Sequence, residues 1–403
     1  MKVLMMVSQF FPAGVGGAER QCLRQASALV RRGHEVTILT KWLVPESARR
    51  EEVDGVCILR WGCFFSLRRA FKRRWAAHAE SSPMKSPESS AVPHFGRSRW
   101  GHASEWLRNA LFIMEMGWGA KTGRLTCDVV HVHTSDWIAG LGQWVGEMMK
   151  TPVFSKEAFQ PVLLFGTEPD MPWSGVWRKR RLKCRFIAMT DGIAGSLVAA
   201  GIPRERIVPI PNGVEIPKEV ADPGSSSVAI YAGNFTQGVA HKGFDLLLRA
   251  WGNARRQEPG MRLRLYGRGD STPWRAYADE QGCGDSVAFE GETDDIWAAH
   301  RGAGFLVLPS RQEGLSNSLL EAMASGLPAV VSDIPGNLAA IRDGVEGIVV
   351  PVGDADALAK AMVRLYRSPE LRARMGSAAR MRAQEVFAID KVAAQLEEAY
   401  ARA

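Results

Sequence analysis

Short apolar runs alternate with amphipathic stretches along most of the chain, and this rhythm predicts parallel βαβ units. In the first half the expected strands, each rich in β-branched or aromatic residues, are 3–7, 35–40, 128–133, 152–156 and 185–189. A helix is expected from about Ala18 to Arg32, because its apolar residues recur at helical spacing and Gly33 can terminate it.

The second half repeats this rhythm more regularly. The expected strands are 227–233, 261–267, 286–291, 304–310, 328–333 and 347–351. They are almost continuously apolar, as strands are when helices cover both faces of a parallel sheet. Helices are expected between them, including 244–256 and 293–301, and from about Asp354 to the C-terminus. The pattern predicts an α/β fold, and ADPGSSS (221–227) is the best linker by composition.

Composition sets the scale of this fold. At about 100–200 residues per domain, 403 residues predict two or three domains. An apolar content of 46% excludes disorder as the main state. No uncharged apolar run is long enough for a membrane span, and the apolar N-terminus is typical of a buried strand rather than a signal peptide. Six cysteines without a CxxC pair indicate a reducing cytoplasm.

The net charge of +8 is unevenly distributed, with +11 in residues 1–200 and −3 in the remainder. This asymmetry suggests two domains, one of which meets an anionic surface or substrate. Within the basic half, aromatic and basic side chains interleave over 61–78, and a Ser/Pro-rich stretch, expected to be a mobile loop, follows at 81–99. The 61–78 stripe is typical either of a helix at an anionic membrane or of a surface helix packed on its own domain.

The strongest chemical signal is LPSRQEGLSNSLLEAMASGLPAVVSD (308–333). A strand should end at Pro309, a loop should carry Glu313, and a helix should run from near Asn317 to just before Gly326. The first turn of such a helix offers unpaired N–H groups and a partial positive charge, which suit a phosphate. Glu321, one turn inside the helix, is placed to accept hydrogen bonds from ribose hydroxyls.

This segment resembles the E-x₇-E motif of retaining GT-B glycosyltransferases of family four, which include bacterial surface-polysaccharide enzymes. Four further stretches resemble the family in order: its glycine loop at 14–20, its histidine strand at 128–137, its NGV turn at 187–215 and its lysine loop at 232–251. The resemblance covers nearly the whole chain and is weakest over about 42–125. It implies two Rossmann-like domains with parallel sheets facing a central cleft. We expect an N-terminal acceptor domain (1–218), a C-terminal nucleotide-sugar domain (219–385) and a C-terminal helix (386–403) that crosses back to the first.

The resemblance also implies roles for individual residues. Glu321 would bind the donor ribose and Glu313 would steady the donor sugar, whereas a plain helix glutamate would only be solvated. Lys242 would neutralise the leaving diphosphate, with Gly243 allowing close backbone approach, although a loop lysine is usually just solvated. The residues expected to contact the donor are Gly16, Gly17, Asn234, Lys242, Arg268, Glu313, Gly314, Leu315, Ser316, Asn317 and Glu321.

Two positions in these motifs, Asn234 and Glu19, carry a qualification. Asn234 stands where the family commonly has an arginine, so one charge contact to the diphosphate is either missing or supplied elsewhere, with Arg268 and Arg311 as the candidates. The glutamate at position 19, after the glycine loop, is fully explained by the favourable interaction of its carboxylate with the dipole at the start of the following helix.

The catalytic residues that the resemblance implies are His133, Lys242 and Glu313. His131 and His133 alternate along one strand, so their side chains share a face, and His133 best matches the active-site histidine of the family. The alternative for both is a buried core histidine. No convincing DxD motif and no His/Cys cluster with ligand spacing occurs, and Asp294 and Asp295 lie where a helix start favours acidic residues. We therefore expect no metal and no cofactor.

The resemblance, taken with these features, implies a retaining glycosyltransferase of polysaccharide biosynthesis. It would move a sugar from a UDP- or GDP-sugar donor to a lipid-linked or cell-surface glycan precursor, as a cytoplasmic protein peripheral to the inner face of the cell membrane. The competing case is a soluble acceptor, such as a small sugar or a secondary metabolite. One alternative is a nucleotide-sugar epimerase of the same architecture. Another is a nucleic-acid-binding protein, but the basic residues form no recognisable motif for DNA or RNA, so no nucleic acid partner is expected.

Overall fold

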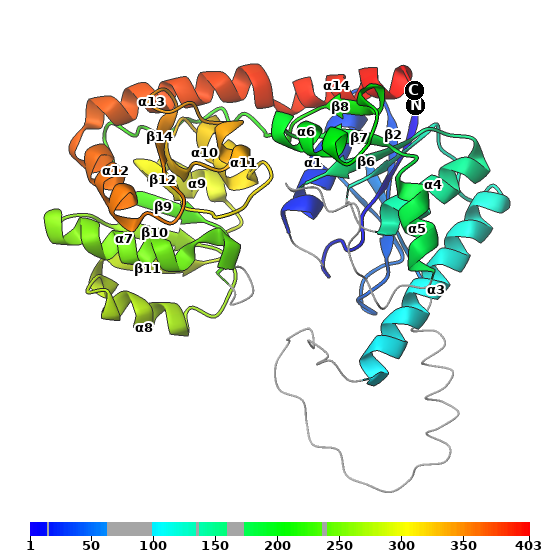
Figure 1. Ribbon diagram of the computed structural model, residues 1–403, viewed down its shortest axis with the longest axis horizontal. Coiled ribbons are helices and arrows are strands. Elements are labelled where there is room, and N and C mark those ends of the chain that lie inside the picture. The colour runs from blue at the N-terminus through cyan, green and yellow to red at the C-terminus, as the bar shows by residue number, and fades with distance from the viewer. Residues whose placement is uncertain (14–15, 63–98, 134–136, 159–172, 236–239) are drawn as a thin grey trace, which may run out of the picture. The chain divides into compact units, whose positions relative to one another are not determined.

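The computed structural model describes residues 1–13, 16–62, 99–133, 137–158, 173–235 and 240–403 (Figure 1). The chain divides into two compact units. The first holds Met1–Lys156, Leu164–Phe186 and Ala403, and the second holds Glu157–Leu163 and Ile187–Arg402. The aromatic–basic stripe at 61–78 and the Ser/Pro-rich stretch at 81–99 lie almost entirely outside the described residues.

The first sheet has eight strands in the order β3-β4-β2-β1-β5-β6-β7-β8. Their bounds are β1 Lys2–Met6, β2 Glu35–Lys41, β3 Arg50–Val53, β4 Val56–Trp61, β5 Val129–Val132, β6 Val153–Glu157, β7 Arg185–Ala188 and β8 Ile207–Pro209. β1 lies parallel to both β2 and β5, with Met5 opposite Ile38 and His131. All five strands expected from the first half are confirmed.

Sequence reasoning missed β3, β4 and β8. β3 pairs antiparallel with β4, and the turn between them is Asp54-Gly55, both with positive φ (51° and 75°). Asp-Gly between two alternating runs is a strong signal for a two-residue hairpin. The signal was therefore present in the sequence. The hairpin adds an antiparallel edge beside strands β4, β2, β1, β5 and β6, which pair in parallel.

The helices along the first half of the chain are α1 Gly17–Arg31, α3 Arg99–Lys121, α4 Trp137–Met149, α5 Ser174–Arg181, α6 Asp191–Ala199 and the short η1 Arg204–Arg206. α1 confirms the expected first helix. Its start is closed by the Glu19 carboxylate, which accepts a hydrogen bond from the Gly16 backbone N–H at 2.9 Å. In the described part of the chain, no helix has the length and apolar composition that a membrane span requires.

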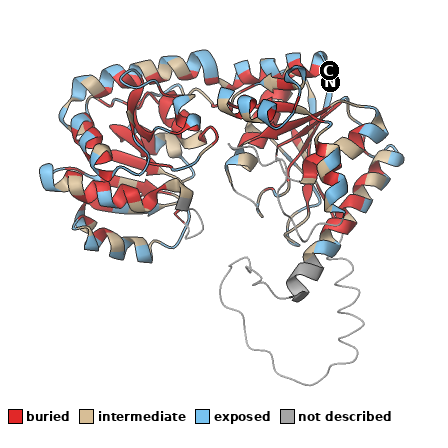
Figure 2. Ribbon diagram, in the orientation of Figure 1, coloured by how far each residue is buried: buried red, intermediate tan, exposed pale blue. Residues whose placement is uncertain are grey.

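The second sheet has six parallel strands in the order β11-β10-β9-β12-β13-β14. Their bounds are β9 Ala229–Ala232, β10 Leu263–Tyr266, β11 Val287–Gly291, β12 Phe305–Leu308, β13 Ala329–Ser332 and β14 Gly347–Val350. All six were expected from the apolar runs. The strands are largely buried, in keeping with helices packed against the sheet (Figure 2).

The helices of this unit are η2 Ala240–Lys242, α7 Phe244–Gln257, α8 Thr272–Glu280, η3 Gly284–Ser286, α9 Ile296–Arg301, α10 Asn317–Ala324, α11 Pro335–Leu338, α12 Ala355–Arg367, α13 Pro369–Arg382, η4 Ala383–Phe387 and α14 Ile389–Ala401. The expectation of one helix from Asp354 to the C-terminus was wrong in detail. The helical conformation is interrupted at Ser368, because the proline that follows disfavours helical geometry in the residue before it. It is interrupted again at Ala388.

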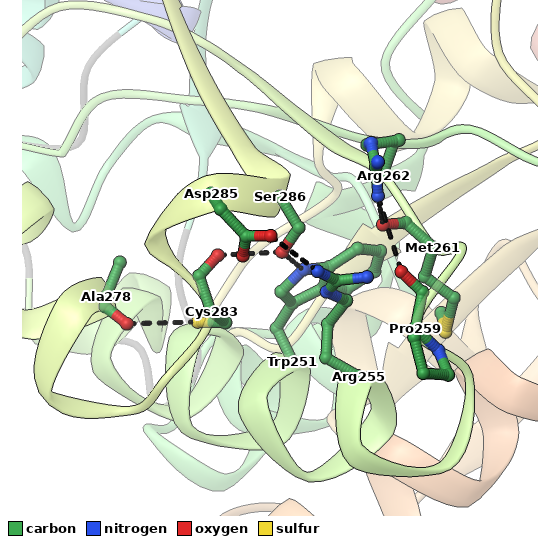
Figure 3. Close-up of polar contacts among 9 residues, drawn as sticks. All are labelled: Trp251, Arg255, Pro259, Met261, Arg262, Ala278, Cys283, Asp285 and Ser286. Atoms are coloured by element: carbon green, nitrogen blue, oxygen red, sulfur yellow. Dashed lines mark hydrogen bonds and ion pairs between the residues drawn. The ribbon is translucent and has the colours of Figure 1, made fainter.

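Polar contacts hold α7 in the core of this unit (Figure 3). The buried Trp251 indole donates to Ser286 Oγ at 3.0 Å, and that hydroxyl donates to the Cys283 carbonyl at 2.7 Å. Further along α7, Arg255 forms an ion pair with Asp285 at 2.8 Å. These contacts fix the later part of α7 against the segment after α8, and the candidate site begins at the other end of this helix.

The proposed linker at 221–227 is tied into the second unit. Ala221 N–H donates to the Ser325 carbonyl at 2.8 Å, and the buried Arg372 guanidinium donates to the Pro223 carbonyl at 2.6 Å. The division into units falls after Phe186, inside β7, while the strands of the first sheet continue to Pro209. The boundary at 218 and the crossing of the C-terminal helix stay predictions.

Candidate functional site

The candidate site lies at the carboxyl ends of β9, β10 and β12 and at the first turns of α7 and α10. β9 pairs with β10 on one side and with β12 on the other, so the loops after these three strands meet at one edge of the sheet. This is the edge at which open α/β sheets bind ligands. Nine of the sequence-predicted site residues belong to this unit: Asn234, Lys242, Arg268, Glu313, Gly314, Leu315, Ser316, Asn317 and Glu321.

An ion pair between Lys242 and Glu313 forms the centre of this region. The Glu313 side chain is 9% exposed and the Lys242 side chain 25% exposed. Ser310 Oγ donates a second hydrogen bond to Glu313 Oε1 at 3.1 Å. A carboxylate with two donors in a mostly buried position is held in one orientation, while the lysine head stays partly accessible to solvent.

The backbone brings these two side chains together. Gly243 caps α7 in the left-handed region with φ of 68°, and an added Cβ there would overlap the carbonyl oxygen of Pro309 at the end of β12. In the same place, Arg311 N–H donates to the His241 carbonyl at 2.7 Å. Only glycine allows this approach of protein backbone to position 243, and the close approach of a diphosphate to Gly243 stays a prediction.

The loop at Glu313-Gly314 is enclosed by backbone on two sides. A Cβ on Gly314 would overlap the Ala158 carbonyl oxygen, and a Cβ on Gly336, at the start of α11, would overlap the Gly314 carbonyl oxygen. Gly336 had no assigned role in the sequence analysis. Glycine is required at position 336 because α11 packs directly onto the loop that carries Glu313.

α10 begins at Asn317, as expected, and its first turn is anchored by a residue from the NGV turn. The buried Asn212 amide donates to the Leu315 carbonyl at 2.9 Å and to Asn317 Oδ1 at 3.2 Å. Ser316 precedes the helix, with its hydroxyl 3.1 Å from that of Ser318. Glu321, one turn further, is buried, which argues against the alternative of a solvated helix residue.

The two arginines suggested as substitutes at the Asn234 position are both paired with carboxylates. Arg268 pairs with Glu292, and its backbone N–H donates to Asn234 Oδ1 at 3.4 Å. Arg311 binds Asp245 through two nitrogens at 2.8 and 2.7 Å, and these hydrogen bonds lower the pKa of the Asp245 carboxyl. An incoming anion would therefore have to compete with an existing partner for either guanidinium.

Tyr231 is a buried residue near this site that sequence reasoning missed. Its hydroxyl has no hydrogen-bond partner among the described residues. Burial raises the pKa of this phenol, and the nearby Glu313 carboxylate raises it further. The sequence did contain a signal for this residue: Tyr231 comes two residues before Gly233, at the end of the buried strand β9. A tyrosine at that position places a polar group beneath the loop that follows the strand.

The remaining predicted residues, Gly16, Gly17 and His133, belong to the first unit. His133 follows β5 and stacks on His131, with ring centroids 4.2 Å apart and planes at 28°. Both rings are buried, and burial together with neighbouring basic groups holds the pKa of each well below its ordinary value. Asp295 accepts a hydrogen bond from Ala298 N–H at 3.0 Å and caps α9, as expected from its position.

Comparison with known proteins identifies the family. A model described as Glycosyltransferase Family 4 matches residues 15–217, and one described as Glycosyl transferases group 1 matches residues 226–368. The first match covers half of the chain. The chain belongs to glycosyltransferase family 4. The resemblance drawn from the sequence motifs is therefore confirmed.

Curated relatives of this family member match over part of their length. The chain is 34% identical over 176 residues to a phosphatidyl-myo-inositol mannosyltransferase of Mycobacterium leprae, which covers 41% of the chain and 46% of the relative. It is 29% identical over 309 residues to a D-inositol 3-phosphate glycosyltransferase of Streptomyces bingchenggensis, covering 68% and 67%. The chain thus spans about half the length of the first relative and two thirds of the second.

Solved structures resemble the whole chain. HepE of Anabaena, in complex with UDP and glucose, matches with a TM-score of 0.68 at 17% identity, covering 100% of both chains. Sucrose-phosphate synthase from Thermosynechococcus elongatus matches with a TM-score of 0.72 at 18% identity, covering 100% of this chain and 98% of the other. At these identities the likeness establishes the fold, which is the expected GT-B fold of two α/β domains.

Proposed function

We propose that this family member transfers a glycosyl unit from a nucleotide-diphosphate sugar to an acceptor, with retention of anomeric configuration and without a metal. The observation that carries the proposal is the Lys242–Glu313 pair, held by close backbone packing next to the first turn of α10. It combines a partly accessible cation, an oriented carboxylate and a helix start at one sheet edge, which are the groups that a diphosphate sugar requires.

Each group has a separate task in this proposal. Lys242 turns from Glu313 toward the diphosphate and neutralises charge as the leaving group departs. Backbone N–H groups of the first α10 turn add hydrogen bonds to the same phosphates. Glu321 accepts hydrogen bonds from the ribose hydroxyls, and Glu313 hydrogen-bonds the donor sugar.

In this proposal the configuration is retained because the acceptor attacks the face of the sugar from which the leaving group departs. No carboxylate of the candidate site is an obvious nucleophile, so we favour an oxocarbenium-like state stabilised by hydrogen bonds over a covalent intermediate. His133 is the residue of the first unit that we assign to the reacting sugar. Because burial keeps its imidazole neutral, it would act as a hydrogen-bonding group rather than as a cation.

The acceptor is proposed to be a lipid-linked or cell-surface glycan precursor at an anionic membrane. The excess of +11 in residues 1–200 supports this, as does the phosphatidyl-myo-inositol in the name of one relative. A further support is α3, which is apolar on two faces. It buries Phe112 and Met116 but exposes Leu107, Met114 and Trp118, by 41%, 66% and 61%. At intervals of seven and four residues, these three share one helix face.

The test is a transfer assay with a panel of UDP- and GDP-sugars, with and without a lipid extract as acceptor. We expect acceptor-dependent release of nucleotide, and NMR of the product should give the same anomeric configuration as the donor. An inverted product would refute retention. Nucleotide release that is equal with and without acceptor, together with an epimerised sugar, would favour the epimerase.

A further inference from the structure

A buried hydroxyl at the candidate site contributes nothing to the hydrogen bonding of the described residues. Tyr231 is fully buried on β9, and its hydroxyl has no hydrogen-bond partner in the described part of the chain. A buried hydroxyl without a partner destabilises the folded state, whereas phenylalanine would fill the same space without this cost. The presence of the hydroxyl therefore calls for a role other than the stability of this state.

The ring of Tyr231 packs at the backbone contact that forms the ion pair of the candidate site. Its centroid is 5.3 Å from that of Phe244, the first residue of α7. Phe244 directly follows Gly243, which is so close to the Pro309 carbonyl, at the end of β12, that an added Cβ would overlap it. β9 itself pairs in parallel with β12. The tyrosine therefore lies between the strand and the helix start that carry the ion pair.

The hydroxyl of Tyr231 lies toward the carboxyl edge of the sheet. A Cβ added to Gly233, just after β9, would be 2.9 Å from the hydroxyl oxygen and farther from the ring atoms. Burial raises the pKa of this phenol, and the charge of the Glu313 carboxylate raises it further. The phenol thus keeps its proton, so the hydroxyl is available as a hydrogen-bond donor at the edge where the ion pair lies.

The Glu313 carboxylate loses a donor in the proposed reaction. Its Oε1 accepts hydrogen bonds from Lys242 and, at 3.1 Å, from Ser310 Oγ. The Glu313 side chain is 9% exposed, so little water can replace the ammonium group once the lysine turns to the diphosphate. A mostly buried carboxylate that keeps only one donor is destabilised and less firmly oriented, so a replacement donor is needed.

We propose that Tyr231 is a positioning residue whose hydroxyl donates to the Glu313 carboxylate when Lys242 turns to the leaving diphosphate. The carboxylate then exchanges one donor for another and keeps the orientation that the donor sugar requires. The inference rests on the proposed function in one respect, namely that Lys242 leaves Glu313 during the reaction. The exchange itself can be measured without a substrate, because Lys242→Met removes the ammonium group permanently.

The direct test is calorimetric unfolding of the full chain in four forms: the wild type, Tyr231→Phe, Lys242→Met and the double variant. In the wild-type background, loss of the unpaired hydroxyl should leave the melting temperature unchanged or raise it. In the Lys242→Met background, the same substitution should lower the melting temperature by at least about 2 °C, because a hydrogen bond to a buried carboxylate is then lost. The control Tyr277→Phe, on α8, should give the same shift in both backgrounds.

Two outcomes of the unfolding measurements would overturn the inference. A lower melting temperature of Tyr231→Phe in the wild-type background, or its failure to fold, would mean that the hydroxyl already stabilises the free protein. Equal shifts in the two backgrounds would mean that the hydroxyl and the lysine are not coupled. If Lys242→Met does not fold, Lys242→Ala takes its place, and the wild-type background still decides the first point.

Kinetics separate this inference from the proposed function. Tyr231→Phe should lower kcat about tenfold with little change in KM for the donor, because Glu313 loses its orientation only after Lys242 has turned away. A purely structural hydroxyl would lower stability and kcat together, whereas here kcat falls and stability does not. An unchanged kcat would overturn the exchange of donors and leave the glycosyltransferase proposal intact. If the wild type transfers no sugar, the proposed function fails, and the unfolding measurements still decide whether the hydroxyl replaces the lysine.

Discussion

Lys242 and Glu313 are 71 positions apart in sequence, yet their side chains form an ion pair. The pair exists because Gly243 lets the turn before α7 lie on the backbone at the end of β12. It brings together the lysine loop and the first glutamate of the E-x₇-E segment, which the sequence presents as separate motifs. Each residue thereby restricts the other before any substrate binds.

The packing at Gly243 predicts a large cost for a single methyl group. Gly243→Ala adds both an unfavourable positive φ and an overlap with the Pro309 carbonyl. Gly282→Ala is a matched control, because its φ of 70° is nearly the same and an added Cβ meets nothing within 4 Å. The control should cost about 1–2 kcal/mol, and Gly243→Ala more, with weaker nucleotide binding. Equal melting temperatures in calorimetry would contradict the packing argument.

The two glutamates should respond differently to substitution. Glu321→Ala should weaken nucleotide binding at least tenfold, because each lost hydrogen bond from a ribose hydroxyl to the carboxylate is worth about 1.5–3 kcal/mol. Glu313→Ala should mainly lower kcat. Titration calorimetry with UDP and GDP checks the first, with the exposed Glu280→Ala of α8 as control. Unchanged affinity in Glu321→Ala would remove that residue from the site.

Activity should persist when divalent metals are removed. Lys242 and the α10 backbone already place positive potential where the diphosphate leaves. The measurement is the initial rate of transfer after dialysis against a chelator, compared with the rate after magnesium or manganese is restored. Loss of activity that either metal rescues would refute metal independence.

Membrane contact should depend on the exposed face of α3. Met114→Glu and Trp118→Glu should lower co-sedimentation with anionic vesicles, since each replaces an apolar side chain with a negative charge. Met381→Glu is the control, because it alters an exposed methionine on α13 in the other unit. Binding should also weaken as salt rises, because the Debye length falls from about 10 Å at 0.1 M to 3 Å at 1 M. Equal recovery of the wild type with neutral and anionic lipids at low salt would refute the proposal.

Acid should destabilise the second unit through His300. This imidazole is buried on α9, its Nδ1 lies 3.0 Å from Ser325 Oγ, and burial lowers its pKa to about 4. Below the unfolded value of about 6.5, the unfolded chain binds a proton that the folded chain does not, so stability falls as the pH falls. By pH 4 the loss reaches about 3 kcal/mol. The loss should be absent in His300→Gln, and an identical pH profile of unfolding in both proteins would contradict this account.

The sequence by itself determined most of the strands, the fold class and the family. Near-continuous apolar runs identified every strand of the second sheet, and the motif at 308–333 located both the helix start at Asn317 and the two glutamates. Such features depend on residues that are neighbours in the chain, because backbone hydrogen bonding and side-chain alternation are local. The Asp-Gly turn of the β3–β4 hairpin is an equally local signal, although the strands expected from the sequence did not include this hairpin.

Only the tertiary structure decided which side chains meet. It paired Lys242 with Glu313, packed Gly336 against Gly314, placed Tyr231 beneath the site and buried Lys156 beside two histidines. These contacts depend on the order of strands in each sheet and on the path of the loops between them. Alternation along β6 could assign Lys156 to one face, but the sequence alone does not show that a lysine is buried. Its burial follows only when the neighbouring strand and the covering helix exclude water from its charge.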